Sequence, residues 1–64
     1  MHWTVRYVFA VAADRDISVR ELERESGVGV NTISRWKEEG RMPNINSLEK
    51  VLASLGYRLK IEKI

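Results

Sequence analysis

Apolar residues recur at helical spacing near the start of the chain and predict a helix over residues 3–14. One stripe follows the i, i+3, i+4, i+7 spacing of a single helical face and comprises Val5, Val8, Phe9 and Ala12. A second apolar stripe of Trp3, Tyr7 and Val11 lies beside it, so this helix is expected to be buried on more than one side. The alternation of apolar residues from Trp3 to Phe9 also leaves a strand possible at the N-terminus.

Start and stop signals bound a second helix. Ser18 is a good N-cap, and Glu21, three residues later, completes the spacing of a capping box. The helix is expected to run to about Ser26, because Gly27 can adopt the left-handed conformation that ends a helix.

A third helix is predicted from about residue 30 to residue 39. Ile33 and Trp36 point to one side of it, toward the core. The opposite face carries Val30, Asn31, Ser34, Arg35 and Glu38. Gly40 is expected to close this helix, and residues 41–43 read as a loop. Both tryptophans, Trp3 and Trp36, are expected in the core rather than as a stacking platform for bases.

A fourth helix and an extended tail complete the chain. Asn44 is predicted to cap a helix that ends at Gly56 and has one apolar stripe: Ile45, Leu48, Val51, Leu52 and Leu55. Residues 57–64 then change period. Tyr57, Leu59 and Ile61 alternate with Arg58, Lys60 and Glu62, which is the pattern of a β-strand. The fold class predicted is mainly α, with four to five helices and a strand-like C-terminal tail.

Length and composition indicate one small domain, over residues 1–64, that needs further stabilisation. A chain of 64 residues buries only about 60% of the surface that its unfolded form exposes. It has no cysteine and one histidine, His2, which argues against disulfides and a zinc site and fits a reducing cytoplasm. Oligomerisation is the remaining device. We therefore expect a homodimer, with Tyr57, Leu59 and Ile61 as its contacts. Two alternatives stay open: the tail can pair with the chain's own N-terminal segment around residues 3–5, and the apolar first helix can form the dimer interface instead.

Charge is distributed unevenly along the chain. Residues 1–34 hold four basic and five acidic side chains, whereas residues 35–64 hold seven basic and four acidic ones. The positive half begins inside the third predicted helix, a distribution that permits nucleic-acid binding. No apolar stretch approaches the ~20 residues of a membrane span, so no membrane partner is expected.

Two short helices joined through a glycine form a helix-turn-helix arrangement. From Ile17 to about Leu55 the sequence resembles the lambda-repressor/Cro-type (XRE) family. The apolar and turn positions of the motif fall on Leu22, Gly27, Val28, Ile33 and Trp36. The segment from Glu38 to Pro43 is similar to the loop that follows the recognition helix. The resemblance implies a lambda-repressor-like domain whose motif spans about residues 18–39.

Two positions depart from the family pattern. Glu23 stands where the family usually has a small residue, often alanine, that lets the two helices approach closely. We expect its side chain to lean toward solvent. Val19 stands where a glutamine often contacts the DNA backbone in phage repressors, so this contact is expected to be either absent or made by the neighbouring Arg20.

The third helix is therefore the candidate reader of DNA bases. The major groove is about 12 Å wide, admits one helix and presents an unambiguous pattern of donors and acceptors. Asn31 can bind adenine through N6 and N7, and Arg35, four residues later, can bind guanine through O6 and N7. Val30 can contact a thymine methyl group, and Ser34 can reach a base or a phosphate.

Phosphate contacts are expected around this reading face. Lys37 and Arg41, late in the third helix and in the following loop, are the candidates together with Arg20. Glu38 would repel phosphate, so we expect it at the rim or reading a cytosine amino group.

These features predict a sequence-specific, double-stranded DNA-binding regulator of transcription, a repressor acting as a dimer on a palindromic operator in the cytoplasm. A protein-interaction module that keeps the fold, such as an antitoxin-like partner or an adaptor, is the alternative. The nearly all-apolar first helix and the strand-like tail favour a protein partner as much as self-association. No nucleophile–base pair, glycine-rich phosphate loop or metal-ligand spacing occurs in the sequence, so neither catalysis nor a cofactor or metal is expected.

Overall fold

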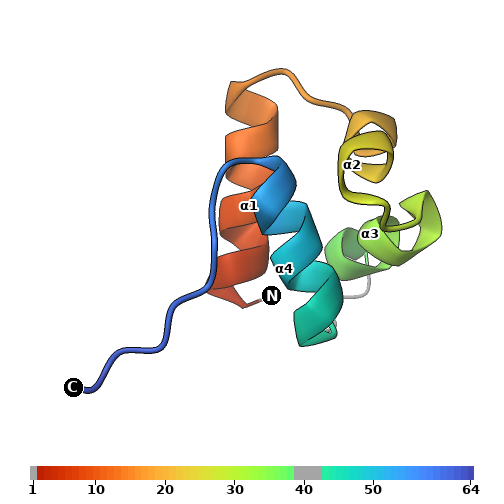
Figure 1. Cartoon of the computed structure of the whole chain (residues 1–64). Coiled ribbons are helices and arrows are strands. Elements are labelled where there is room, and N and C mark those ends of the chain that lie inside the picture. Colours follow the sequence, from red (N-terminus) through yellow and green to blue (C-terminus); the bar gives the residue numbers. More distant parts are fainter. Residues whose placement is uncertain (1, 39–42) are drawn as a thin grey trace.

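The computed structural model describes residues 2–38 and 43–64 and contains four helices in that part of the chain (Figure 1). They are α1 (Trp3–Asp14), α2 (Val19–Ser26), α3 (Val30–Glu38) and α4 (Ile45–Ser54). All four were predicted from the sequence. The predicted end of the third helix at Glu39, its closure by Gly40, and residues 41–42 of the loop lie outside the described residues.

Side chains next to the helix starts explain three of the helix boundaries. The His2 Nδ1, Ser18 Oγ and Asn44 Oδ1 atoms accept hydrogen bonds from backbone N–H groups in the first turns of α1, α2 and α4 respectively. Each bond satisfies one of the N–H groups that a helix start leaves without an intrahelical partner. The Ser18 and Asn44 caps were predicted, whereas the His2 cap was not.

Left-handed residues end three of the helices. Gly27 (φ 79°) and Gly56 (φ 88°) have the conformation that glycine adopts without steric penalty. Asp16 (φ 57°) takes the same role after α1, where the Asp16 N–H donates to Ala13 O and the Ile17 N–H donates to Ala12 O. These paired bonds form a Schellman motif. They bend the chain from α1 toward α2.

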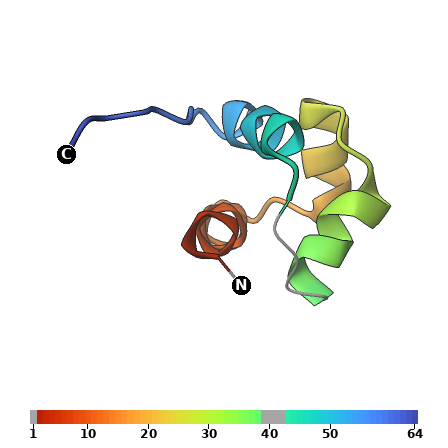
Figure 2. The same ribbon diagram turned by 90° about the horizontal axis from the view of Figure 1, so that it is seen from below.

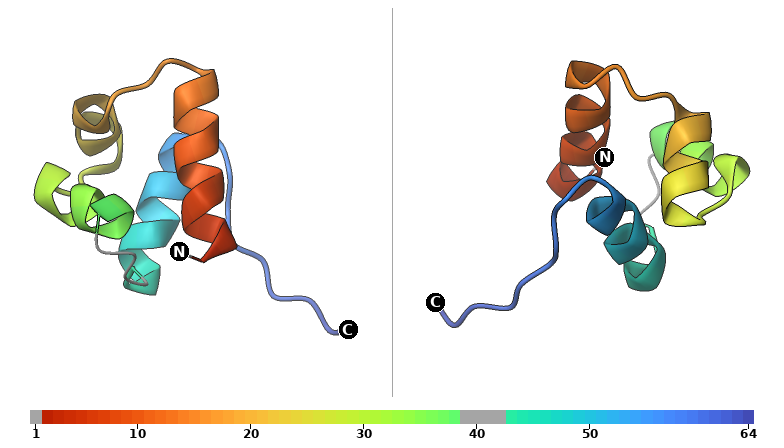
Figure 3. Two further views of the ribbon diagram at one scale, coloured as in Figure 1. Left: turned by 180° about the vertical axis from the view of Figure 1, so that it is seen from behind. Right: turned by 45° about the horizontal axis from the view of Figure 1, so that its top comes forward.

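One apolar core joins the helices. Its buried residues come from all four helices, the α2–α3 turn and the C-cap of α4: Val5, Val8, Ala12, Leu22, Val28, Ile33, Trp36, Leu48, Val51, Leu52 and Leu55. α2 packs against both α3 and α4, and α1 packs against α4. Figure 3 shows α4 between α1 on one side of the molecule and the α2–α3 pair on the other. This arrangement holds α3 at the edge of the domain.

The two tryptophans have different environments. Trp36 is 3% exposed and belongs to the core, as predicted. Trp3 is 69% exposed, so its predicted place in the core is wrong. α1 turns Val5, Val8 and Ala12 inward, and among the four helices that the structure describes it packs chiefly against α4. The second apolar stripe of α1 therefore stays largely at the surface.

Strand structure is absent from residues 2–38 and 43–64, which corrects two expectations. The apolar alternation from Trp3 to Phe9 lies in α1 and not in a strand. The strand-like tail is not a strand in the single chain, because a strand requires a partner for its backbone groups. Instead, the Tyr57 N–H donates to Leu52 O at 2.8 Å, and the tail then leads away from α3 (Figure 2).

Candidate nucleic-acid interface

The connection between α2 and α3 is short and closed by hydrogen bonds. The Gly27 N–H donates to Glu23 O at 2.8 Å, and the Val28 N–H donates to Ser26 Oγ at 3.1 Å. The Val28 side chain is buried and anchors the turn in the core. The relative orientation of α2 and α3 is therefore defined by both backbone bonding and packing.

The exposed face of α3 gathers the four predicted base-contacting residues. Ile33 and Trp36 are buried, and at about 3.6 residues per turn this places positions 30, 31, 34 and 35 on the opposite side. Asn31 and Arg35 are exposed, whereas Val30 and Ser34 are half-buried. The structure thus brings an amide, a guanidinium, a hydroxyl and a small apolar side chain onto one helical surface.

Unlike the base-contacting residues, the predicted phosphate-contacting residues do not all lie on α3. Arg20 is exposed in the first turn of α2. The Lys37 ammonium lies 5.8 Å from the centroid of the Phe9 ring of α1, a cation–π contact that directs this side chain toward α1. Arg41 lies outside the described residues.

A hydrogen bond from α2 to the start of α3 was not foreseen from the sequence. Glu23 Oε2 accepts from the Val30 N–H at 2.8 Å. Glu23 is exposed, as expected, but its carboxylate is bound to the neighbouring helix rather than free in solvent. One signal was available in the sequence: the residue before α3 is Gly29, which has no side chain to cap the helix.

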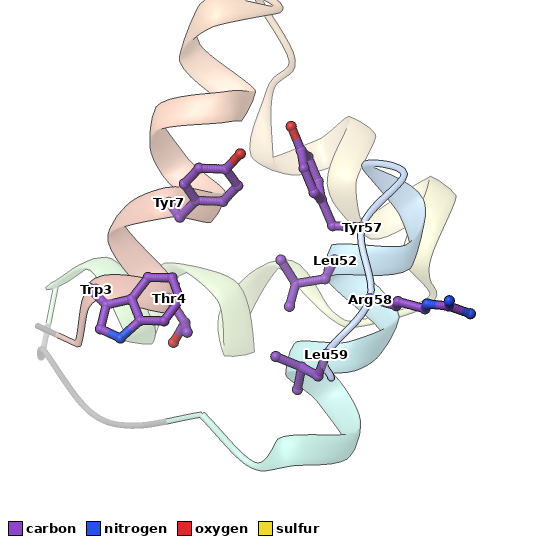
Figure 4. A pocket seen from close by; sticks show the side chains of 7 residues that line it. All are labelled: Trp3, Thr4, Tyr7, Leu52, Tyr57, Arg58 and Leu59. Atoms are coloured by element: carbon purple, nitrogen blue, oxygen red, sulfur yellow. The ribbon is translucent and has the colours of Figure 1, made fainter. Parts of the chain in front are cut away.

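An open groove of about 240 Å³ lies between α1, α4 and the tail (Figure 4). It is lined by Trp3, Thr4, Tyr7, Leu52, Tyr57, Arg58 and Leu59. The Tyr7 and Tyr57 rings meet edge to face with their centroids 5.2 Å apart. In Figure 4 the Arg58 side chain points away from the groove. The interior of the groove is therefore mainly aromatic and aliphatic.

Arg15 supports the rim of this groove. Its guanidinium donates to Leu55 O at 2.8 Å and lies 5.8 Å from the centroid of the Tyr57 ring. Hydrogen bonding to the Tyr57 side chain, together with desolvation, raises the pKa of the Tyr7 hydroxyl above its ordinary 10.0, and the Arg15 charge opposes the rise. Tyr7 is therefore protonated and uncharged at neutral pH.

The three predicted dimer residues divide into two groups. Tyr57 contacts Tyr7, and Leu59 packs against the core, so both contact their own chain. Ile61 is fully exposed. The residues on either side of Ile61 in the sequence form an ion pair, with the Lys60 Nζ and Glu62 Oε1 atoms 3.2 Å apart.

Across 2–38 and 43–64, His, Asp and Glu side chains form no group of three or more that could hold a metal ion. None of the helices in these ranges is both long enough and apolar enough to cross a membrane.

A short helix, a tight turn and a second helix with an exposed polar face together define the helix-turn-helix class. A family model described as helix-turn-helix matches residues 11–61. The chain belongs to this family, which is the lambda repressor/Cro (XRE) type and consists of DNA-binding regulators of transcription. No curated protein and no solved structure matches the chain.

Proposed function

We propose that this chain binds double-stranded DNA in a sequence-specific manner by placing α3 in the major groove. The observation that carries the proposal is the exposed face of α3, on which Asn31 and Arg35 lie side by side at the edge of the domain. Amide and guanidinium groups are the side chains that pair with adenine and guanine through two hydrogen bonds. The core residues Ile33 and Trp36 hold this face outward.

In the proposed complex, each residue of the face has a distinct partner. Asn31 bonds adenine N6 and N7, and Arg35 bonds guanine O6 and N7. Val30 contacts a thymine methyl group, and Ser34 bonds a base or a phosphate. Glu38 is exposed at the end of α3 and lies at the rim of the groove.

Phosphate contacts position the domain on the duplex. Arg20 is exposed at the start of α2 and is proposed as the main contact from this helix. Lys37 and Arg41 are proposed as further contacts. Lys37 would first have to leave the Phe9 ring, an exchange of one electrostatic partner for another.

Selection from random duplexes, followed by a salt titration on the selected sequence, tests DNA binding. For a protein that contacts phosphates, log Kd rises linearly with the logarithm of the salt concentration. The slope is about 0.9 for each phosphate that the protein neutralises. We expect an enriched motif and a slope of several units. Failure to enrich any sequence, together with salt-independent binding to a protein partner, would favour the interaction-module alternative.

We further propose that the tail joins two copies of the chain into a symmetric dimer. Within the described residues, no backbone hydrogen bond ties residues 58–64 to the rest of the chain. Residues 3–5 are helical and offer no strand edge for the tail to pair with. The same segment of a second copy can pair with it, and this pairing would give a twofold axis.

Apolar surface supports the same interface. Trp3 is 69%, Tyr7 43% and Tyr57 37% exposed, and Ile61 is fully exposed. An aromatic side chain buries about 150–250 Å² of surface. Covering the exposed parts of these four side chains in both copies therefore removes on the order of 800 Å² of surface from water. This is below the ~1,200 Å² of a standard interface, so backbone pairing has to contribute. A weak dimer that DNA stabilises is the expected form.

A symmetric dimer presents two copies of α3 to one face of a duplex. Successive major grooves on one face are about 34 Å apart, so the proposed operator is palindromic. A dimer bound across a promoter excludes other proteins from that DNA, so repression is the proposed regulatory effect. The proposed location is the cytoplasm, where a regulator of this type meets its DNA.

A further inference from the structure

The start of α3 differs from the starts of the other three helices. α1, α2 and α4 are each capped by the side chain of the preceding residue: His2, Ser18 and Asn44. The residue before α3 is Gly29, whose carbonyl accepts from the Ile33 N–H at 3.1 Å. Gly29 has no side chain to accept from the first turn. The N–H groups that a helix start leaves without partners therefore depend on an acceptor from elsewhere.

Glu23 in α2 supplies that acceptor. Its Oε2 atom lies 2.8 Å from the Val30 backbone nitrogen, across the turn between the two helices. A bond from an N–H to a charged carboxylate is stronger than one between neutral groups. The negative charge also interacts favourably with the positive end of the helix dipole. One side chain thus caps α3 and ties it to α2.

We propose that Glu23 is a positioning residue for DNA recognition. By holding the Val30 N–H, it keeps the first turn of α3 helical, and this turn carries Val30 and Asn31. Helix ends fray readily, whereas a recognition surface binds best when its geometry is formed in advance. The inference rests on the proposed function of the α3 face. It assigns a role to the position where this chain departs from the small residue of its family.

Three variants separate the hydrogen bond from the charge. Glu23→Ala removes both. Glu23→Gln keeps an oxygen that can accept from the Val30 N–H and removes only the charge. Glu25→Ala is the matched control, because Glu25 is exposed on the same helix and its change removes one negative charge without touching the cap. Circular dichroism identifies a temperature at which all variants are folded.

Affinity for the selected duplex and for an unrelated duplex is then measured by fluorescence anisotropy. We expect Glu23→Ala to weaken binding to the selected duplex by about tenfold relative to Glu25→Ala, with at most about a twofold change on the unrelated duplex. Glu23→Gln is expected to recover most of the lost affinity. Equal affinity and equal selectivity of Glu23→Ala and Glu25→Ala would overturn the proposal.

Amide hydrogen exchange of the DNA-free protein tests the bond itself. The Val30 N–H should exchange slowly in the parent and in Glu23→Gln and rapidly in Glu23→Ala. Identical exchange in the three proteins would also overturn the proposal. If selection with the parent enriches no duplex, and the parent binds none, the proposed DNA-binding function fails. If the parent binds one duplex selectively and Glu23→Ala binds it with the same affinity and selectivity, only the positioning role of Glu23 fails.

Discussion

Arg35 is the side chain on the α3 face with the greatest capacity to discriminate between bases. It is exposed and lies one turn beyond Asn31, on the side of α3 opposite the buried Ile33 and Trp36. A guanidinium can donate two parallel hydrogen bonds to guanine O6 and N7, which no other base offers in the same positions. The chemistry of this one group therefore sets an expectation for both affinity and specificity.

Replacing Arg35 by alanine is expected to weaken binding to the selected duplex by about 1–3 kcal/mol and to relax the preference at one base pair. Competition assays with duplexes substituted at each position measure both effects. Thr32→Ala, which changes an exposed residue at the flank of α3, serves as the control. If Arg35→Ala binds the site with the affinity and selectivity of the parent, this face of α3 does not read the bases.

Asp16 offers a second test at the residue scale, this time of stability. Its left-handed backbone (φ 57°) is unfavourable for a residue with a Cβ atom and natural for glycine. Asp16→Gly is expected to stabilise the fold by about 0.5–1 kcal/mol, because relief of the strain outweighs the added flexibility of the unfolded chain. Urea denaturation measures the change. An unchanged or lower midpoint would mean that the Asp16 side chain makes a compensating interaction.

At the scale of helices, the ends of the elements explain most of the architecture. Ser18 and Gly27 bound α2, and Asn44 and Gly56 bound α4, each through local hydrogen bonds or a left-handed residue. Such signals involve residues that are close in sequence, so they are readable without a structure. α3 is the exception, since the acceptor at its start comes from Glu23, seven residues earlier in another helix.

Removal of the α2 cap should lower stability measurably. Ser18→Ala deprives the Glu21 N–H of its 3.2 Å acceptor, and we expect a loss of about 0.5–2 kcal/mol in the free energy of unfolding. Ser18→Gly should lose only a few tenths of a kcal/mol, because glycine is itself tolerated at the N-cap. Urea denaturation of the two variants beside the parent gives the comparison. Equal stability of Ser18→Ala and the parent would show that the Ser18 side chain does not stabilise the start of α2.

At the scale of the whole molecule, two surfaces lie apart from each other. The α3 face is on one side, and the groove between α1, α4 and the tail is on the other, with the tail leading away from α3 (Figures 1 and 2). This separation leaves the α3 face free for DNA when the groove side meets a second copy. The proposed dimer contact and the proposed DNA contact therefore use different residues of the chain.

Ile61→Lys is expected to shift the protein from dimer to monomer, because it puts a charge on the apolar face of the tail. Sedimentation equilibrium across micromolar concentrations measures the change. Ile64→Lys is the control, since Ile64 is exposed but falls on the other face of an extended chain. A parent that is monomeric at high micromolar concentration, or an Ile61→Lys variant that remains dimeric, would contradict the proposed interface.

The sequence by itself determined the local features of this protein: the four helices, the caps at Ser18 and Asn44, the burial of Ile33 and Trp36, and the helix-turn-helix resemblance. These follow from periodicity and from hydrogen bonds between near neighbours in the chain. The polar face of α3 was predicted on the same basis, because burial of one side of a helix exposes the other.

Only the tertiary structure decided the features that depend on which elements meet. The surface position of Trp3 follows from how α1 packs against α4, and periodicity within α1 does not contain that information. The strand pattern of residues 57–64 gives no strand in one chain, because a strand needs a second strand and helix α1 does not provide one. The contacts of Glu23 with Val30 and of Lys37 with Phe9 join residues on different helices. Their physical cause is the relative placement of those helices, which is set by the packing of the whole core.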